Sequence, residues 1–168
     1  MLSKLKLKAI IATLLLPGMV ILLIPCLILH SFTPTEWPAV SITTILVTLM
    51  AIAALIVLLH CIWDFAFYGW GTLAPLDPPK ILIIRGLYRY TRNPMYLAVV
   101  CILLAEAWLF SSISMFIYTV LVFLCFHLFV IYYEEPHLRS QFGASYQEYT
   151  HVIPRWAITT RPSKPGYK

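Results

Sequence analysis

Long apolar stretches separated by shorter polar segments make up most of the chain. Four stretches are long enough, or nearly so, to cross a bilayer as helices, and they cover about residues 9–29, 39–63, 95–110 and 113–133. Only Ser111 and Ser112 separate the last two, so these spans are expected to form an antiparallel helical hairpin. The pattern predicts an all-α integral membrane protein with about four transmembrane helices, in which residues 1–158 form a single domain.

Two polar segments interrupt or follow the spans. The longer connection, Asp64–Pro94, is rich in proline and glycine, and loops of this length are usually functional. After the fourth span, Phe142, Tyr146 and Tyr149 recur at helical spacing, which predicts a short amphipathic helix with an aromatic stripe. Such a stripe either lies on the membrane interface or packs as core. Residues 159–168 are basic and proline-rich, and we expect a disordered tail.

Composition excludes an ordinary soluble domain. Of the 168 residues, 61% are hydrophobic and 11% are charged, and the mean hydropathy is +0.85. A net charge of +5 can indicate nucleic-acid binding, but the basic residues are sparse and flank apolar stretches, so membrane orientation explains them better. The four cysteines lie in apolar segments without metal-binding spacing, and no metal site is expected.

The positions of the basic residues predict how the chain is oriented. Four spans would place the N-terminus, the connection Asp64–Pro94 and the C-terminus on one side of the membrane. Those segments contain every lysine and arginine of the chain. Positively charged loops face the cytoplasm, so both termini are predicted to be cytoplasmic. The hairpin then brings the polar residues near 95 beside those near 133, on the cytoplasmic face.

The two polar segments together predict a site with both signs of charge. Arg85, Arg89 and Arg92 are three and four residues apart, and a helical turn would place them on one face. Glu134 and Glu135 follow the fourth span. Such a site, with aromatic walls and a side open to lipid, could hold a polar cofactor against a lipid-soluble substrate. Alternatively, the arginines only anchor the helices and the glutamates only hydrate the interface.

The motifs in the second half of the chain resemble those of a known family. The run Gly86-x-Tyr88-x-x-x-Arg92-Asn93-Pro94-x-Tyr96 is followed by Glu134-Glu135-x-x-Leu138-x-x-x-Phe142-Gly143-x-x-Tyr146-x-x-Tyr149 and by Pro154-Arg155-Trp156. Their order and spacing resemble the isoprenylcysteine carboxyl methyltransferase family, which belongs with the integral-membrane phospholipid methyltransferases. The family commonly has histidine where this chain has Asn93. Asparagine keeps a donor and an acceptor but cannot carry charge or transfer a proton.

The resemblance implies an S-adenosyl-L-methionine site at the cytosolic end of the last helices. Arg92 and Asn93 would hold the methionyl end of the cofactor, and Glu134 and Glu135 its amino or hydroxyl groups. The predicted cofactor-binding residues are Gly86, Tyr88, Arg92, Asn93, Tyr96, Glu134 and Glu135. The predicted substrate-binding residues are Tyr146, Tyr149, Arg155 and Trp156, although Arg155 could equally be an interfacial anchor. No catalytic residue is assigned, because the cofactor is already activated and the protein has to position it.

The resemblance therefore predicts methyl transfer to a lipophilic acceptor from the bilayer, such as an isoprenylcysteine-type carboxylate. A lipid amine or another apolar acid or thiol also satisfies the pattern. Two other hypotheses stay open. Membrane sterol reductases, which bind NADPH, share an Arg-x-Pro-x-Tyr run, and a non-catalytic helical membrane protein could keep the fold alone. Glu106, His60 and His127 are interpreted as structural polar groups within or near the spans.

Overall fold

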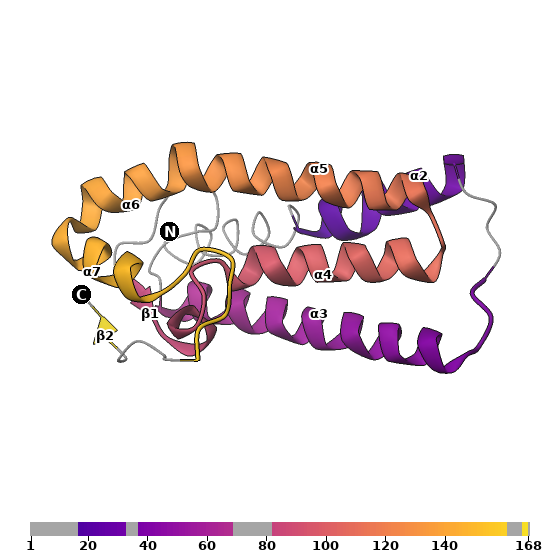
Figure 1. The fold of residues 1–168 in the computed structure, drawn as a ribbon, viewed down its shortest axis with the longest axis horizontal. Helices are drawn as coiled ribbons and strands as arrows, with labels where there is room; N and C mark the ends of the chain where they lie inside the picture. The colour runs from indigo at the N-terminus through magenta and orange to yellow at the C-terminus, as the bar shows by residue number, and fades with distance from the viewer. Residues whose placement is uncertain (1–16, 33–36, 69–81, 161–165, 168) are drawn as a thin grey trace, which may run out of the picture.

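The molecule is a bundle of long helices, with short helices and loops gathered at one end (Figure 1). The computed structural model describes residues 17–32, 37–68, 82–160 and 166–167. The bundle consists of the helices α2 (Ile24–Phe32), α3 (Ile42–Tyr68), α4 (Pro94–Leu109) and α5 (Ile113–Phe129). A short π-helix, η1 (Met19–Leu23), leads directly into α2. Three predicted spans therefore correspond to α3, α4 and α5. Of the first, residues 9–16 lie outside the described part of the chain, and the rest falls in η1 and α2.

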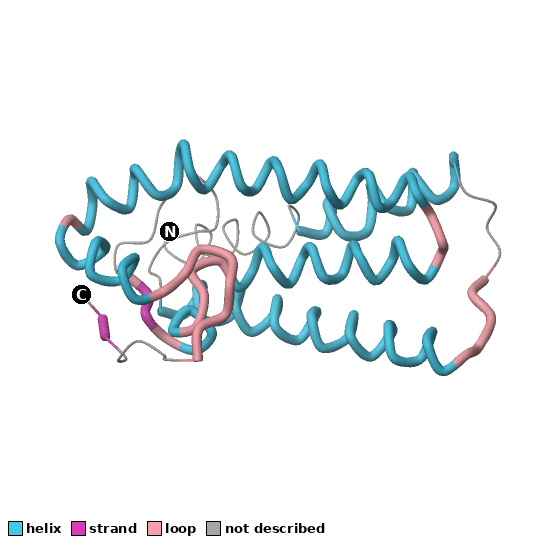
Figure 2. The backbone as a smooth tube through the Cα atoms, in the orientation of Figure 1, coloured by secondary structure: helices cyan, strands magenta, loops and turns pink. Residues whose placement is uncertain are grey.

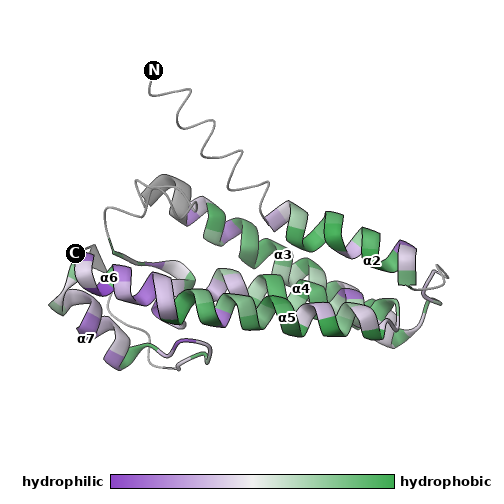
Figure 3. Ribbon diagram, turned by 90° about the horizontal axis from the view of Figure 1, so that it is seen from above, coloured by the Kyte–Doolittle hydropathy of each residue, from purple (hydrophilic) through white to green (hydrophobic). Residues whose placement is uncertain are grey.

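Two segments, Ile42–Asp64 and Ile113–Phe142, are helical, long and apolar enough to cross a membrane. Met19–Phe32 and Pro94–Leu109 are shorter apolar helices. Apolar residues cover the bundle, and hydrophilic ones gather in the short helices at one end (Figure 3). Large side chains such as Leu46 and Ile56 on α3 are exposed. An apolar outer surface of this extent is suited to lipid.

Helix α4 lies between α3 and α5 (Figures 1 and 2). Its buried residues include Ala98, Ala105 and Ala107, and small side chains let neighbouring helices approach closely. At its far end the predicted hairpin is confirmed, because α5 begins directly after Ser112. The Ser112 side chain accepts a hydrogen bond from Met115 N at 3.3 Å, which caps the helix.

The fourth span continues as one helical rod beyond its predicted end. A π-helical segment η3 (Val130–Glu134) joins α5 to α6 (Glu135–Phe142). Gly143, at φ +51°, ends α6, and α7 (Ala144–Val152) begins after it. The sequence predicted one short amphipathic helix here, whereas the structure has two short helices. The cause is Gly143, whose left-handed backbone breaks the helix between Phe142 and Tyr146.

A second, smaller hydrophobic core lies within the polar end of the molecule. Leu82, Ile84, Tyr146, Tyr149 and Ile153 are buried in it, and Leu138 and Phe142 pack against it. The aromatic stripe therefore packs as core, although its members belong to two helices.

The remaining described elements are short and belong to the same end of the molecule. Strand β1 (Ile83–Ile84) pairs antiparallel with β2 (Gly166–Tyr167), and the 3₁₀ turn η2 (Gly86–Arg89) follows β1. Apart from this two-residue pair, the regular structure of the described residues is helical, as predicted. Within the tail 159–168, residues 161–165 and 168 lie outside the described part.

Candidate functional site

The predicted site residues all lie at the polar end, where α4 begins and the rod leaves the bundle. A strap, residues 153–159, runs back from α7 across the start of α4 (Figure 2). Three segments distant in sequence therefore meet, namely the turn before α4, the start of α6 and the strap. The predicted hairpin places the turn before α4 beside the start of α6. The strap reaches them because the chain reverses direction through α7.

Arg92, Glu135 and Arg155 form an ion-pair cluster at this junction. Arg92 Nη1 donates to Glu135 Oε1 at 2.9 Å. Arg155 binds the same carboxylate with two bonds, from Nε to Oε1 at 2.6 Å and from Nη2 to Oε2 at 2.9 Å. Paired donors of this kind give arginine–carboxylate contacts both strength and fixed geometry. Two guanidinium groups and one carboxylate leave the cluster with one excess positive charge.

The surroundings of Glu135 keep its carboxyl group ionised. Burial by itself raises the pKa of Glu135, but the hydrogen bond from Arg155 and the charges of Arg92, Arg155 and Arg139 outweigh it, so the pKa is lowered. The hydrogen bond to Glu135 in turn raises the pKa of Arg155. The cluster is therefore charged throughout at neutral pH.

One donor of this cluster is left without a partner. Arg92 Nε is buried and has no hydrogen-bond acceptor among the described residues. A buried donor without a partner costs free energy, and in native proteins such groups are rare. The Arg92 main chain is fixed separately, because its N–H donates to Pro154 O at 3.0 Å. An anionic or carbonyl oxygen from a ligand would satisfy the free donor.

Glu134 faces a different partner from its neighbour. Tyr96 Oη donates to Glu134 Oε2 at 3.1 Å, across from the first turn of α4. Burial raises the pKa of Glu134; the Tyr96 hydrogen bond opposes this rise, and the charge of Glu135 adds to it. Consecutive residues of a regular α-helix point about 100° apart. The π-helical segment η3 ends at Glu134, and π segments inside helices often occur at functional sites.

The turn that carries Tyr88 is held against α3. Gly86 has φ +51°, and a Cβ atom placed there would lie 2.6 Å from Asp64 Oδ2 and 3.3 Å from His60 Nε2. Only glycine fits this close approach. Asp64 is buried, and His60 Nε2 lies 3.5 Å from its Oδ2. The absence of a side chain at Gly86 therefore lets this turn pack against the end of α3. Contact between Gly86 and the cofactor stays a prediction.

Asn93 joins the start of α4 to the strap. Its side chain is buried, and Nδ2 donates to Arg155 O at 3.1 Å. Thr91 Oγ1 donates to the same carbonyl at 3.4 Å, and Thr159 N donates to Tyr90 O at 2.9 Å. These bonds, with that between Arg92 N and Pro154 O, fix the strap against residues 90–93. The amide of Asn93 has a structural use that needs a donor and no charge.

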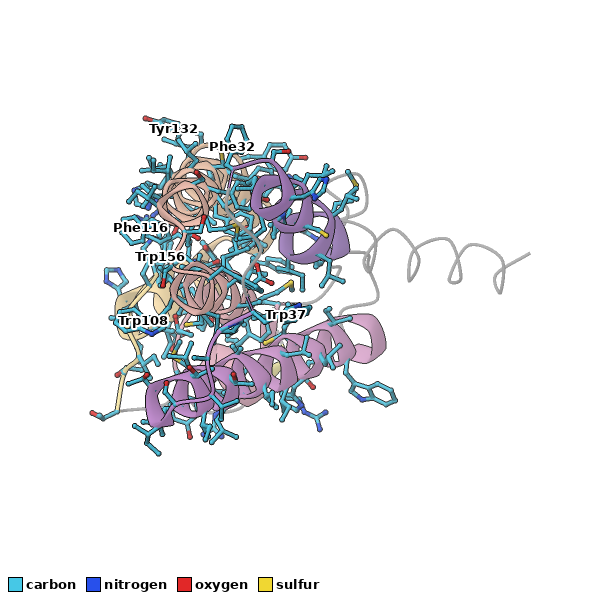
Figure 4. All side chains as sticks on the ribbon, turned by 90° about the vertical axis from the view of Figure 1, so that its right-hand side faces the viewer. Phe32, Trp37, Trp108, Phe116, Tyr132 and Trp156 are labelled. Atoms are coloured by element: carbon cyan, nitrogen blue, oxygen red, sulfur yellow. The ribbon has the colours of Figure 1, made fainter. Side chains whose placement is uncertain are left out.

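An aromatic group closes the side of the site that faces the bundle. The Tyr96 ring stacks on Phe126 with centroids 4.6 Å apart, and Trp156 lies 6.5 Å from Tyr96 and 5.2 Å from Phe123. Trp156 Nε1 donates to His127 Nδ1 at 3.0 Å. Trp156 lies on the side of the bundle away from α2 (Figure 4).

Sequence reasoning missed Phe123 and Phe126, and it did not identify the partner of His127. The only signal available was helical spacing along α5. That helix also contains Phe116, Tyr118 and Phe129, so spacing alone does not single out the rings that face the site.

Tyr146 and Tyr149 are buried in the smaller core next to the site. Their relative exposures are 3% and 5%, and Tyr149 Oη donates to Tyr88 O at 2.6 Å. Burial, and after it the charge of Glu135, raises the pKa of Tyr146 to about 12, against an opposing effect of the charge and hydrogen bond of Arg92. Both rings therefore have a packing role, and their contact with substrate remains a prediction.

Glu106 lies on α4 towards the end opposite the site. Its Oε2 is buried without a hydrogen-bond partner among the described residues. By contrast, His60 and His127 each contact a named polar partner, Asp64 and Trp156. The structural interpretation of the two histidines agrees with these contacts.

Comparison with known proteins gives one match. The family described as phospholipid methyltransferase matches residues 42–145, which is more than half of the chain. The matched part includes α3, α4, α5 and α6, with the arginine-containing turn and both glutamates. No curated protein and no solved structure matches the chain.

Proposed function

The chain belongs to the phospholipid methyltransferase family, a family of membrane methyltransferases, and we propose that it transfers a methyl group from S-adenosylmethionine to a lipophilic acceptor in the bilayer. The acceptor is a membrane lipid or an isoprenylcysteine-type carboxylate. The polar end of the bundle, with the cluster of Arg92, Glu135 and Arg155, faces the cytosol. All arginines of the described residues lie towards that end, in the turn before α4, in α6 and in the strap.

The observation that carries the proposal is the free Nε donor of Arg92. It lies in a cluster with one excess positive charge, and it is buried without an acceptor. A carboxylate supplies both the missing acceptor and the missing negative charge. The carboxylate of the methionyl end of S-adenosylmethionine meets this need. Glu135, whose oxygens are bound by two arginines, then holds those arginines in place and does not itself need to contact the ligand.

Glu134 and the aromatic rings fit the rest of the same cofactor. Glu134 receives a hydrogen bond from Tyr96 on one oxygen, and a carboxylate can accept several more. Amino and hydroxyl groups of a ligand are suitable donors. Tyr96, which binds Glu134 through its hydroxyl group, lies 6.5 Å from Trp156 between ring centroids. A cation over an aromatic ring gains roughly 0.5–2 kcal/mol. A sulfonium group therefore suits this part of the site.

The chemistry asks little of the side chains beyond positioning. Bound S-adenosylmethionine would supply an already activated methyl group. The protein orients the acceptor and keeps water out, and positioning of this kind can lower the barrier by up to about 7–11 kcal/mol. A carboxylate acceptor needs no base. An amine acceptor has to lose a proton, and Glu134 is the carboxylate with a raised pKa at this position.

Thermal unfolding of the purified protein in detergent tests the cofactor directly. A ligand present at about 100 times its Kd stabilises the folded protein by about 2.7 kcal/mol. We expect S-adenosylmethionine to raise the unfolding temperature and NADPH to leave it unchanged. A response to NADPH alone would favour the reductase hypothesis. No response to either compound would favour a non-catalytic membrane protein.

A further inference from the structure

The contact between Trp156 and His127 fixes the state of the imidazole ring. An indole N–H can only donate, so Nδ1 of His127 must offer a lone pair at the 3.0 Å contact. A neutral imidazole carries its single proton on the other nitrogen, here Nε2. Neither nitrogen can accept a proton while this bond is made, because Nδ1 is engaged and Nε2 already holds one. His127 is therefore excluded as a general base in this arrangement.

The bond to His127 fixes the strap at a sensitive position. The two residues before Trp156 hold the site through their carbonyls. Arg92 N donates to Pro154 O at 3.0 Å, and Asn93 Nδ2 donates to Arg155 O at 3.1 Å. The Arg155 side chain binds Glu135. Trp156 thus connects α5 to the part of the strap that makes these three contacts, with Arg92, Asn93 and Glu135.

Packing around the indole supports the same role. The Phe123 ring meets Trp156 edge-on at 5.2 Å between centroids, and the His127 ring lies at 6.0 Å. Phe123 and His127 are one helical turn apart on α5 and stack at 6.1 Å. The rings restrict where the indole can lie, and the hydrogen bond selects its orientation. No other hydrogen bond of the His127 side chain occurs among the described residues.

We infer that His127 is a positioning residue of the methyl-transfer site. Through Trp156 it fastens the strap to α5, and the strap in turn sets the orientation of Arg92, Asn93 and Glu135. Its effect on catalysis rests on the proposed function. The fastening itself does not, because it concerns contacts within the chain.

Hydrogen–deuterium exchange on the ligand-free protein tests the fastening. His127→Leu removes the acceptor and Trp156→Phe removes the donor, whereas the side-chain carbonyl of His127→Gln can still accept from the indole. We expect faster exchange of the Arg92 and Thr159 amides, which bond across the strap, in the first two variants. Exchange in His127→Gln should stay close to wild type. Amides within α4 should be unaffected in all of them.

His30→Leu is a matched control, because His30 is exposed on α2. It should leave the exchange of the strap unchanged. The inference is overturned if Arg92 and Thr159 exchange at the wild-type rate in Trp156→Phe, or if His127→Gln behaves like His127→Leu. Should His127→Leu fail to fold, Trp156→Phe and His127→Gln still decide the outcome.

Cofactor affinity is the second measurement. Losing one neutral hydrogen bond that orients the site should weaken S-adenosylmethionine binding by up to about ten-fold. We expect this loss in His127→Leu and in Trp156→Phe, no further loss in the double variant, and recovery in His127→Gln. Additive losses in the double variant would contradict a single shared contact. If wild type binds no S-adenosylmethionine, the proposed function fails, while the exchange experiment still tests the fastening.

Discussion

Arg155 binds Glu135 with two hydrogen bonds of 2.6 and 2.9 Å, so that a residue of the strap is fixed to the first turn of α6. The sequence placed these residues 20 positions apart and suggested separate uses for them, Glu135 towards the cofactor and Arg155 towards the substrate or the interface. In the structure each neutralises the other, and Arg92 shares the same carboxylate. The pair therefore organises the site on which the other predicted residues converge.

The first prediction concerns this ion pair. Arg155→Lys keeps the charge but cannot offer two parallel donors. We expect the free energy of unfolding to fall by about 1.5–3 kcal/mol, the usual value of a charged hydrogen bond. Arg139→Ala is the control, because Arg139 is exposed and acts on Glu135 only through its charge. Equal unfolding free energies for Arg155→Lys and Arg139→Ala would contradict the importance of the paired bonds.

The second prediction uses the lowered pKa of Glu135. A carboxyl group whose pKa is lower in the folded state stabilises the protein above its unfolded pKa, near 4.3 for glutamate. That contribution is lost as the pH falls from there through the folded pKa. Wild type should therefore lose stability on acidification below about pH 4.3 more steeply than Glu135→Gln does. The free energy of unfolding of both proteins, measured at a series of pH values, checks this. An equal loss of stability in the two proteins would argue against this role.

The third prediction concerns Asn93. Its amide donates to Arg155 O, and a histidine N–H could make the same bond. Asn93→His should keep cofactor affinity within a few-fold of wild type. Asn93→Asp places an acceptor against a carbonyl and should destabilise the protein by about 1–3 kcal/mol. Unfolding and binding measurements on both variants check this, and equal tolerance of the two would exclude the donor role.

Gly86 gives a fourth prediction with an internal control. Gly86→Ala adds a Cβ 2.6 Å from Asp64 Oδ2 at a backbone φ of +51°. Gly143→Ala has the same φ but meets nothing within 4 Å, so it isolates the backbone strain, which costs about 1–3 kcal/mol. We expect Gly86→Ala to lower the unfolding temperature more than Gly143→Ala does. Adding Asp64→Ala to Gly86→Ala should recover the difference. Failure to recover it would place the cause elsewhere.

The fifth prediction tests the orientation of the bundle. Val40 is exposed ahead of α3, and Gln147 is exposed on α7 at the polar end. In a chain without its native cysteines, Val40→Cys should react with an impermeant thiol reagent only from outside the cell, and Gln147→Cys only from the cytosol. Reaction of both from one side would contradict the three crossings expected between them.

Most of the bundle was predictable because long apolar stretches leave few alternatives. The spans of α3, α4 and α5, the tight turn at Ser111 and Ser112 and the meeting of the two polar segments all follow from apolar length and short connections. The break at Gly143 was less accessible. Its glycine could be seen, but helical spacing continues through it from Phe142 to Tyr149, and periodicity favoured one helix over two.

Partners within the site were harder to predict than its location. Charge complementarity does not specify which arginine meets which glutamate, since Arg85, Arg89, Arg92 and Arg155 all carry the same charge. The choice of Arg92 and Arg155 depends on the strap, whose path is set by main-chain bonds to residues 90–93 that no sequence pattern encodes. The same holds for Trp156 in the strap, whose partner His127 lies 29 residues earlier on α5.

Transfer of a labelled methyl group from S-adenosylmethionine to a membrane lipid extract tests the central claim most directly. Wild type should produce a labelled lipid. Arg92→Lys keeps the charge but lacks the free Nε donor of the guanidinium, and it should weaken cofactor binding about ten-fold or more, as expected for one lost charged hydrogen bond. Arg139→Ala should label at the wild-type rate. A wild-type protein that is folded, yet neither binds S-adenosylmethionine nor labels any lipid, would contradict the account.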